Sequence, residues 1–377
     1  MPTAAELREE FLLDPGVVFL NHGSFGACPR GIFERYQAWQ RELERQPVEF
    51  LSRRLPDLLA EARARLAAEV GAAADDLVFV PNATSGVNVA ARAIDLRPGD
   101  EVLATDLEYG ACDLAWEALC ARAGARYVRA EISRPIGGDV VAQLFAARTE
   151  ATRAVFVSHI TSETAVRLPV EEIVARGHAE GLLAIVDGAH APGQIVPLDL
   201  GALGADFYAG NCHKWLCAPK GSGFLHVRPE HQERVGGVIV SWGYDEGGGT
   251  FLSRSERQGT RDPSAYLTVP DAIDWLAAHD WDAVRERCRA LTREARRRLL
   301  ELPGIEPVAP EELVDQMASV ALPRCDGKEL QRRLYDEQRV EVPVMDRRAP
   351  PLLRVAIQGY NDERDVDALV DALATRL

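Results

Sequence analysis

Lysine is scarce in this sequence. The 43 basic residues include only three lysines, at positions 214, 220 and 328, whereas arginine occurs throughout the chain. Two of the three lie six residues apart in the segment 211–223, NCHKWLCAPKGSG. The role of Lys214, which stands between a histidine and a tryptophan, is therefore the first question that the sequence raises.

Long apolar runs and paired cysteines are also absent. No stretch of about 18 apolar residues occurs, and the acidic N-terminus MPTAAELREEFLLDPG lacks the apolar core of a secretory signal, so we expect neither a membrane span nor export. The seven cysteines are scattered, odd in number and contain no CxxC pair. This pattern favours reduced thiols in the cytoplasm over a disulfide framework or a zinc site, and no metal is expected.

The charge balance limits the range of partners. At a formal net charge of −15, nucleic acids and anionic membranes would repel the chain, so neither is an expected partner. A small anionic ligand in a local pocket is compatible with this charge. With 377 residues, 47% of them hydrophobic, the chain is long enough for one large domain with a smaller one attached.

Strand and helix patterns alternate through the first two thirds of the chain. Apolar spacing and polar boundaries predict helices at 56–70, 109–124 and 170–181, and short apolar runs predict strands at 76–80, 101–106, 152–160 and 182–190. Such alternation is typical of an α/β fold with a mostly parallel sheet covered by helices on both faces. Ligands of these sheets bind beyond the carboxyl ends of the strands.

The pattern of predicted strands and helices changes after about residue 265. A long, arginine-rich helical segment is followed by shorter strand and helix patterns. We therefore predict an N-terminal segment 1–20 that packs near the small domain, a large domain 21–264 and a small α+β domain 265–377.

Polar clusters lie where predicted strands end or predicted helices begin. NATSG, at 82–86, offers backbone N–H groups and the hydroxyls of Thr84 and Ser85, which suit a phosphate group, although an ordinary helix cap uses the same residues. Asp187 ends an apolar strand in IVDGAH, where it is able to keep a ring nitrogen protonated. A turn aspartate is the ordinary alternative.

Lys214 and Arg354 complete this set. A lysine in a partly dry place has a lowered pKa and forms a Schiff base with an aldehyde, whereas Lys220 is predicted to be a loop residue. Arginine binds a carboxylate through two hydrogen bonds. Each residue alone is compatible with a structural role. Together, a phosphate cradle, an aspartate, a lysine and an arginine are what pyridoxal phosphate (PLP) requires.

Three sequence motifs carry a family resemblance. DGAHAPGQ, 26 residues before HKW, resembles the fold-type I PLP enzymes of aminotransferase class V, and the likeness runs over nearly the whole chain. FLNHGSFGACPRGI and RQGTRDPSAYLTVPDAIDWL resemble the isopenicillin N epimerase-like branch. The resemblance implies a large PLP-binding domain with a mostly parallel seven-stranded sheet and a smaller α+β C-terminal domain.

The resemblance also implies roles for individual residues. Lys214 would hold the cofactor as an aldimine and move protons at Cα, Asp187 would contact the pyridine nitrogen, and Tyr109 would stack on the cofactor face. Arg354 would bind the substrate carboxylate. Thr260 would reach the phosphate of the neighbouring subunit, which implies a homodimer. The other implied contacts are Ala83, Thr84, Ser162, His190, Asn211 and His213 to the cofactor, and Asn21 and His22 to the substrate; Asn211 and Ser162 stand where many relatives carry other residues.

Several reactions remain open. The resemblance favours epimerisation or racemisation of an amino-acid-like substrate, with Tyr109 as the second acid opposite Lys214. The alternatives are a C–S or other β-elimination lyase, a deaminating enzyme, an aminotransferase and a catalytically idle binding module. Cysteine-dependent desulfuration is disfavoured, because relatives that perform it carry a cysteine shortly before the substrate arginine, and VPVMDRRAPPLLR, at 342–354, contains none.

Overall fold

The centre of the protein is a seven-stranded sheet, seen in a computed structural model that describes residues 1–236, 238–245, 247–347 and 349–376. All neighbouring strands are parallel except β8, which runs antiparallel to both of its neighbours. In spatial order the strands are β2 (Leu77–Val80), β8 (Gly223–Val227), β7 (Phe207–Asn211), β6 (Leu183–Gly188), β5 (Thr152–Ser158), β3 (Glu101–Thr105) and β4 (Arg126–Ala130). The predicted α/β fold with a mostly parallel sheet is confirmed.

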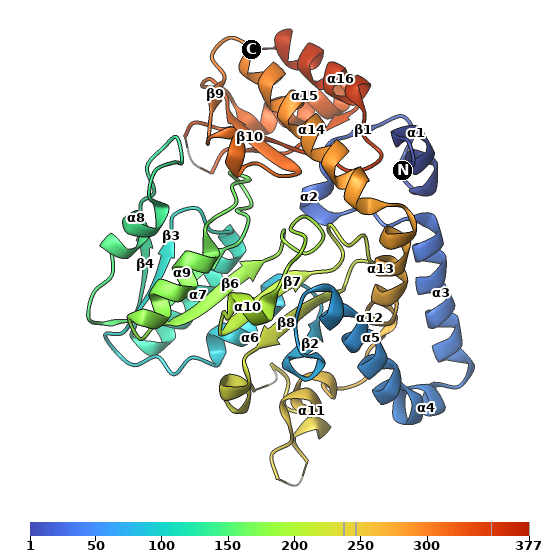
Figure 1. Ribbon diagram of the computed structural model, residues 1–377, viewed down its shortest axis with the longest axis vertical. Coiled ribbons are helices and arrows are strands. Elements are labelled where there is room, and N and C mark those ends of the chain that lie inside the picture. Colours follow the sequence, from blue (N-terminus) through green and yellow to red (C-terminus); the bar gives the residue numbers. More distant parts are fainter. Residues whose placement is uncertain (237, 246, 348, 377) are drawn as a thin grey trace.

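Both faces of this sheet are covered by helices (Figure 1). Successive strand residues point to opposite faces, and β6 illustrates the result. Ile185 belongs to the same apolar cluster as residues of α6 (Ala83–Arg92) and α7 (Gly110–Ala123), whereas Val186 belongs to the cluster that includes residues of α9 (Val170–Ala179). The helices between the strands are α6 (Ala83–Arg92), α7 (Gly110–Ala123), α8 (Val140–Ala146), α9 (Val170–Ala179) and α10 (Leu200–Leu203). The two-sided burial explains why these strands read as nearly continuous apolar runs.

A smaller antiparallel sheet lies in the C-terminal part of the chain. Its strands, in spatial order, are β12 (Val344–Met345), β13 (Leu352–Ala356), β10 (Met317–Ala321) and β9 (Glu306–Pro307). The helices of this part are α14 (Trp281–Leu300), α15 (Gly327–Gln338) and α16 (Glu363–Ala374). Figure 1 shows them grouped at the upper end of the molecule, beside the N-terminal helix α1 (Ala4–Glu10).

The N-terminal segment joins this C-terminal part through backbone pairing. Strand β1 (Val18–Phe19) runs parallel to β11 (Val340–Glu341), and a single bridge joins Asn21 to Ala356. The short helix α2 (His22–Phe25) follows directly, so residues from both ends of the chain are brought to the edge of the large sheet.

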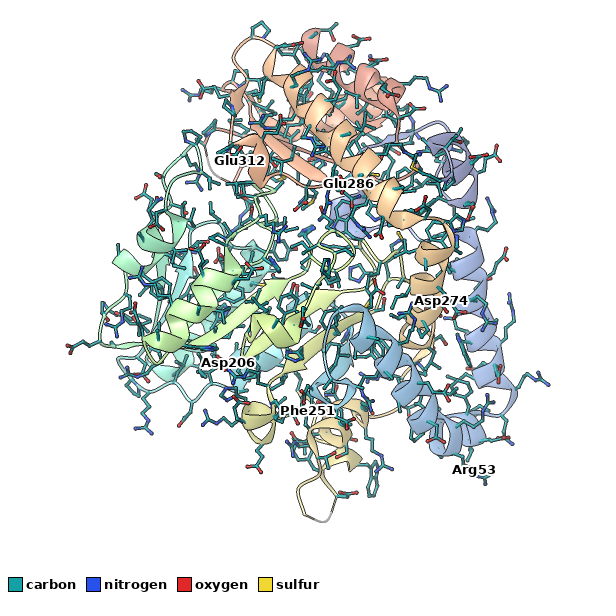
Figure 2. The ribbon with its side chains drawn as sticks, in the orientation of Figure 1. Arg53, Asp206, Phe251, Asp274, Glu286 and Glu312 are labelled. Carbon is teal, nitrogen blue, oxygen red and sulfur yellow. The ribbon has the colours of Figure 1, made fainter. Side chains whose placement is uncertain are left out.

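The remaining helices flank the large sheet. They are α3 (Arg30–Arg45), α4 (Pro47–Glu49), α5 (Leu55–Glu69), α11 (Phe251–Glu256), α12 (Ser264–Leu267) and α13 (Val269–Ala278). Helix α13 packs against α3 and α5, whereas α14 packs against β10. Asp274, labelled in Figure 2, pairs with Arg65 of α5 at 3.0 Å.

The change of packing partner falls at Asp280, which has left-handed backbone angles between α13 and α14. This change of packing partner therefore lies inside the predicted domain 265–377. We retain the division into 1–20, 21–264 and 265–377 as a proposal.

Over the described ranges, no helix is long and apolar enough to cross a membrane.

Candidate active site

A cavity of about 390 Å³ opens at the carboxyl ends of the parallel strands. Strands β2, β5, β6 and β7 end at its wall, and the chain enters loops or helices there. Ten of the thirteen predicted site residues line it: Ala83, Thr84, Tyr109, Ser162, Asp187, His190, Asn211, His213, Lys214 and Arg354. The parallel sheet brings them together because equivalent strand ends meet at one edge.

Lys214 follows β7 and points at the loop that follows β6. Its Nζ lies 3.2 Å from Nε2 of His190, whose Nδ1 accepts a hydrogen bond from Trp215 Nε1 at 3.4 Å. Burial and, to a smaller extent, the nearby Arg354 guanidinium lower the pKa of Lys214 to about 7, although Asp187 opposes the shift. A large fraction of this lysine is therefore an uncharged, nucleophilic amine near neutral pH.

Asp187 is a buried carboxylate at the end of β6. It accepts hydrogen bonds from the Ala189 N–H at 2.9 Å and from the Cys112 thiol at 3.4 Å. Burial raises the pKa of Asp187, since its charged form is poorly solvated there, although these bonds and Lys214 oppose the shift. A cationic ring nitrogen would stabilise the carboxylate at this position.

The N-terminus of α6 forms the opposite wall. Two of its amides are already bound, that of Ala83 by Asn211 Oδ1 at 2.8 Å and that of Ser85 by Asn82 Oδ1 at 2.9 Å. Thr84 lies between them and lines the cavity. This arrangement suits an anionic oxygen group, because amides at a helix start point outward and the helix dipole is positive there.

His213 stands beside this wall and is fixed by its neighbour across the loop. Its Nδ1 lies 2.9 Å from the Ser222 carbonyl, so the ring donates from Nδ1 and keeps Nε2 for another partner. Burial lowers the pKa of His213 to about 4.

Arg354, on β13, closes the end of the cavity nearest the small sheet. Its Nη1 donates to the Ser162 carbonyl at 2.6 Å and its Nη2 donates to Ser24 Oγ at 3.0 Å. Its Nε is buried and has no hydrogen-bond partner among the described residues. Arg354 itself lines the cavity, and a guanidinium is suited to a ligand carboxylate.

Tyr109 is the N-terminal cap residue of α7 and remains 43% exposed. It lines the cavity from the loop after β3.

The structure places three predicted residues elsewhere. The Asn21 side chain binds Glu341 and Ser24, and the buried His22 ring bridges the Lys214 carbonyl and the Tyr360 hydroxyl, each at 2.9 Å. Neither lines the cavity. His22 instead supports the Lys214 backbone, and Asn21 accepts a hydrogen bond from Ser24, which is a partner of Arg354. Thr260 lines a second cavity in this single chain, apart from the first.

Sequence reasoning missed several residues of the cavity wall. Gly23, Ser24 and Phe25 lie directly after the predicted Asn21 and His22, and Lys220 was predicted to be a loop residue only. The scarcity of lysine was the available signal for Lys220.

The residues present fit PLP. The cofactor carries an aldehyde, a basic ring nitrogen and a phosphate, and the cavity offers a partly neutral lysine, a buried carboxylate and a helix N-terminus for these three groups. The guanidinium of Arg354, at the cavity wall, suits the carboxylate of an amino acid.

Comparison with known proteins agrees with this geometry. The family model described as aminotransferase class V matches residues 31–369. The chain is 41% identical to isopenicillin N epimerase of Amycolatopsis lactamdurans, over 98% of this chain and 97% of the relative, and 32% identical to putative L-cysteine desulfhydrase 2 of Oryza sativa, over 99% and 87%.

A solved structure of a C-DES mutant, with glycine covalently linked to the PLP cofactor, superposes with a TM-score of 0.86 at 24% identity, covering 97% of this chain and 98% of that one. This likeness shows the fold. The family match extends over most of the chain, and the predicted family is confirmed: the chain belongs to the aminotransferase class V family.

Proposed function

We propose that this chain is a PLP-dependent epimerase that inverts Cα of an amino-acid-like substrate. The observation that carries the proposal is the convergence of Lys214, Asp187 and Arg354 on one cavity. The choice of epimerisation rests on the 41% identity to isopenicillin N epimerase over nearly the full length of both chains.

Each of these residues has a defined task. Bound PLP supplies an electron-withdrawing ring that acidifies the Cα–H of an attached amino acid. Asp187 holds the ring nitrogen in its protonated form, and Thr84, Asn211 and His213 lie at the wall that receives the phosphate. Arg354, at the cavity wall, orients the substrate carboxylate through its guanidinium.

Proton transfer at Cα needs two groups. Lys214 takes or returns the proton on one face, which its pKa of about 7 allows near neutral pH. Tyr109 serves the opposite face as the second acid. His190, 3.2 Å from Lys214 Nζ, restrains the lysine side chain between turnovers.

A homodimer is part of the proposal. Val238, Ile239, Val240 and Trp242 are 53%, 53%, 78% and 84% exposed in the single chain, an unusual concentration of apolar surface. Trp242 and Thr260 line one cavity of about 810 Å³. A second copy would cover this surface and bring Thr260 toward the phosphate of its neighbour.

Light scattering tests the dimer. We expect the mass of two chains for the wild type and a shift toward one chain for Trp242→Glu. A monomeric wild type with bound cofactor would overturn this part of the proposal.

All seven cysteines are free thiols, and we retain the predicted cytoplasmic location as a proposal.

A lyase is the second candidate, because relatives at about 30% identity include L-cysteine desulfhydrases. One incubation separates the two. Amino acids and their S-conjugates are supplied in deuterated water and read by mass spectrometry and chiral chromatography. Deuterium at Cα with inversion and full recovery of substrate supports the epimerase, whereas release of pyruvate, ammonia or a thiol supports the lyase. If the protein binds the cofactor but gives neither result, transamination or a binding role remains.

A further inference from the structure

Lys220 lines the same cavity as Lys214, so two of the three lysines in the chain border one site. A tight turn sets its position: Ser222 Oγ donates to the Pro219 carbonyl at 2.6 Å, and Gly221 has a φ of +90°, which glycine adopts without strain. The chain enters β8 two residues later. Lys220 therefore projects from a constrained turn and not from a loose loop.

No carboxylate of the described residues forms an ion pair with Lys220. The groups that act on it are the thiols of Cys28 and Cys217, and burial raises the pKa of Cys28 to about 12 and that of Cys217 higher still, so both are neutral. Of the described residues that line the cavity, Asp187 is the one acidic residue, and the basic ones are Lys214, Lys220 and Arg354. A chain with a net charge of −15 thus keeps a surplus of positive charge at this site.

Lys220 and Arg354 stand at different places around the cavity. The segment 24–28 connects the surroundings of the two cations. Its first residue, Ser24, binds Arg354, and its last residue, Cys28, lies near Lys220. Between them, Gly26 lies against the His213 carbonyl. Burial is the main cause of the lowered pKa of both His190 and His22, but Arg354 adds to the shift of His190 and Lys220 to that of His22. The two cations therefore act on different parts of the site.

We infer that Lys220 binds a second anionic group at the far end of the substrate, a side-chain carboxylate, so that the preferred substrates are amino acids with a distal carboxylate. The inference rests on the proposed function, in which Arg354 takes the carboxylate on Cα. The cofactor phosphate presents the same chemistry of anionic oxygens, and the test separates it from a substrate carboxylate.

The test uses the holoenzyme with Lys220→Gln, Lys220→Arg and the control Lys328→Gln on α15. Ligands are matched acid and amide pairs, L-glutamate with L-glutamine and L-2-aminoadipate with its side-chain amide. Binding is measured by calorimetry and by the change in cofactor absorbance, and turnover by deuterium exchange at Cα. Cofactor affinity is measured separately by titrating PLP into apoenzyme.

We expect the wild type and Lys328→Gln to bind the acids more tightly than the amides. Lys220→Gln should weaken acid binding about tenfold, the loss of one charge-assisted contact, and leave amide binding and PLP affinity unchanged. Lys220→Arg should restore part of the preference because it keeps the charge.

Two results would overturn the inference: an equal effect of Lys220→Gln on acids and amides, or a loss of PLP affinity, which would assign Lys220 to the phosphate. The two proposals fail separately. Exchange without acid preference removes the role of Lys220 and keeps the epimerase, whereas acid preference in binding without exchange keeps the role of Lys220 and removes the epimerase.

Discussion

The Lys214 amine lies 3.2 Å from Nε2 of His190, and burial of both groups lowers both pKa values. His190 therefore stays neutral. Because its Nδ1 accepts from Trp215, its Nε2 carries the proton and donates it to the uncharged Lys214 amine. A lysine held in this way is pre-positioned as a nucleophile, because it is directed toward the cavity and partly uncharged.

The pH dependence of Lys214 follows from its lowered pKa. Below about pH 7 the ammonium form dominates and is unreactive, and above it the neutral amine dominates. In apoenzyme treated with an acylating reagent, we expect labelling of Lys214 to rise steeply between about pH 6 and pH 8. Peptide mass spectrometry gives the profile, with the exposed Lys328 as internal reference; identical profiles for the two lysines would contradict the prediction.

Arg354→Lys should raise the KM for carboxylate substrates by about tenfold or more, because an ammonium cannot reproduce the planar fork that also holds Ser162 and Ser24. The kcat should change less. Steady-state kinetics measure both, with Arg53→Lys on the exposed surface, labelled in Figure 2, as the matched control. An unchanged KM would remove Arg354 from the substrate site.

Tyr109→Phe should separate exchange from inversion. The ring that lines the cavity remains, so binding and Cα exchange by Lys214 should persist, but loss of the hydroxyl should slow inversion by about 100-fold. Deuterium incorporation reports exchange and chiral chromatography reports inversion in the same sample. An equal loss of both would make Tyr109 a stacking residue only.

Asp187→Asn should lower kcat by about 100-fold while cofactor still binds, since a neutral amide does not keep a ring nitrogen protonated. The amide oxygen is still able to accept the Ala189 N–H, so the fold should be retained, which a thermal melt checks. Cys112→Ala, which removes only the thiol donor to Asp187, should have a much smaller effect. Equal activity of Asp187→Asn and wild type would exclude the proposed role.

The part of the site that lies at strand ends was predictable from sequence. Asp187 ends an apolar run and Lys214 follows another, and parallel strands place such positions on one edge of the sheet. Helix boundaries followed from local signals as well: α7 ends at Ala123, and Gly124, predicted as its end, is the left-handed cap residue that follows it.

The rest depended on contacts between distant segments. Ser24 reaches Arg354 only because β1 pairs with β11 across more than 300 residues. His22 looked like a ligand contact in the sequence, but Tyr360 and the Lys214 carbonyl occupy both ring nitrogens. Neither the contact of Ser24 with Arg354 nor the contacts of His22 produce a periodic or local pattern in the sequence.

The pairing of β1 with β11 has a consequence for synthesis of the protein. Residues 18–19 leave the ribosome early, but their partner strand emerges only with residues 340–341, and Arg354 follows later still. The large sheet has all of its strands by Val227 and is able to form during translation. The cavity cannot, because its wall needs both ends of the chain. We therefore expect chains arrested before residue 340 to hold a formed sheet and an open, incomplete site, and the N-terminal segment to be the last part of the protein to reach its place.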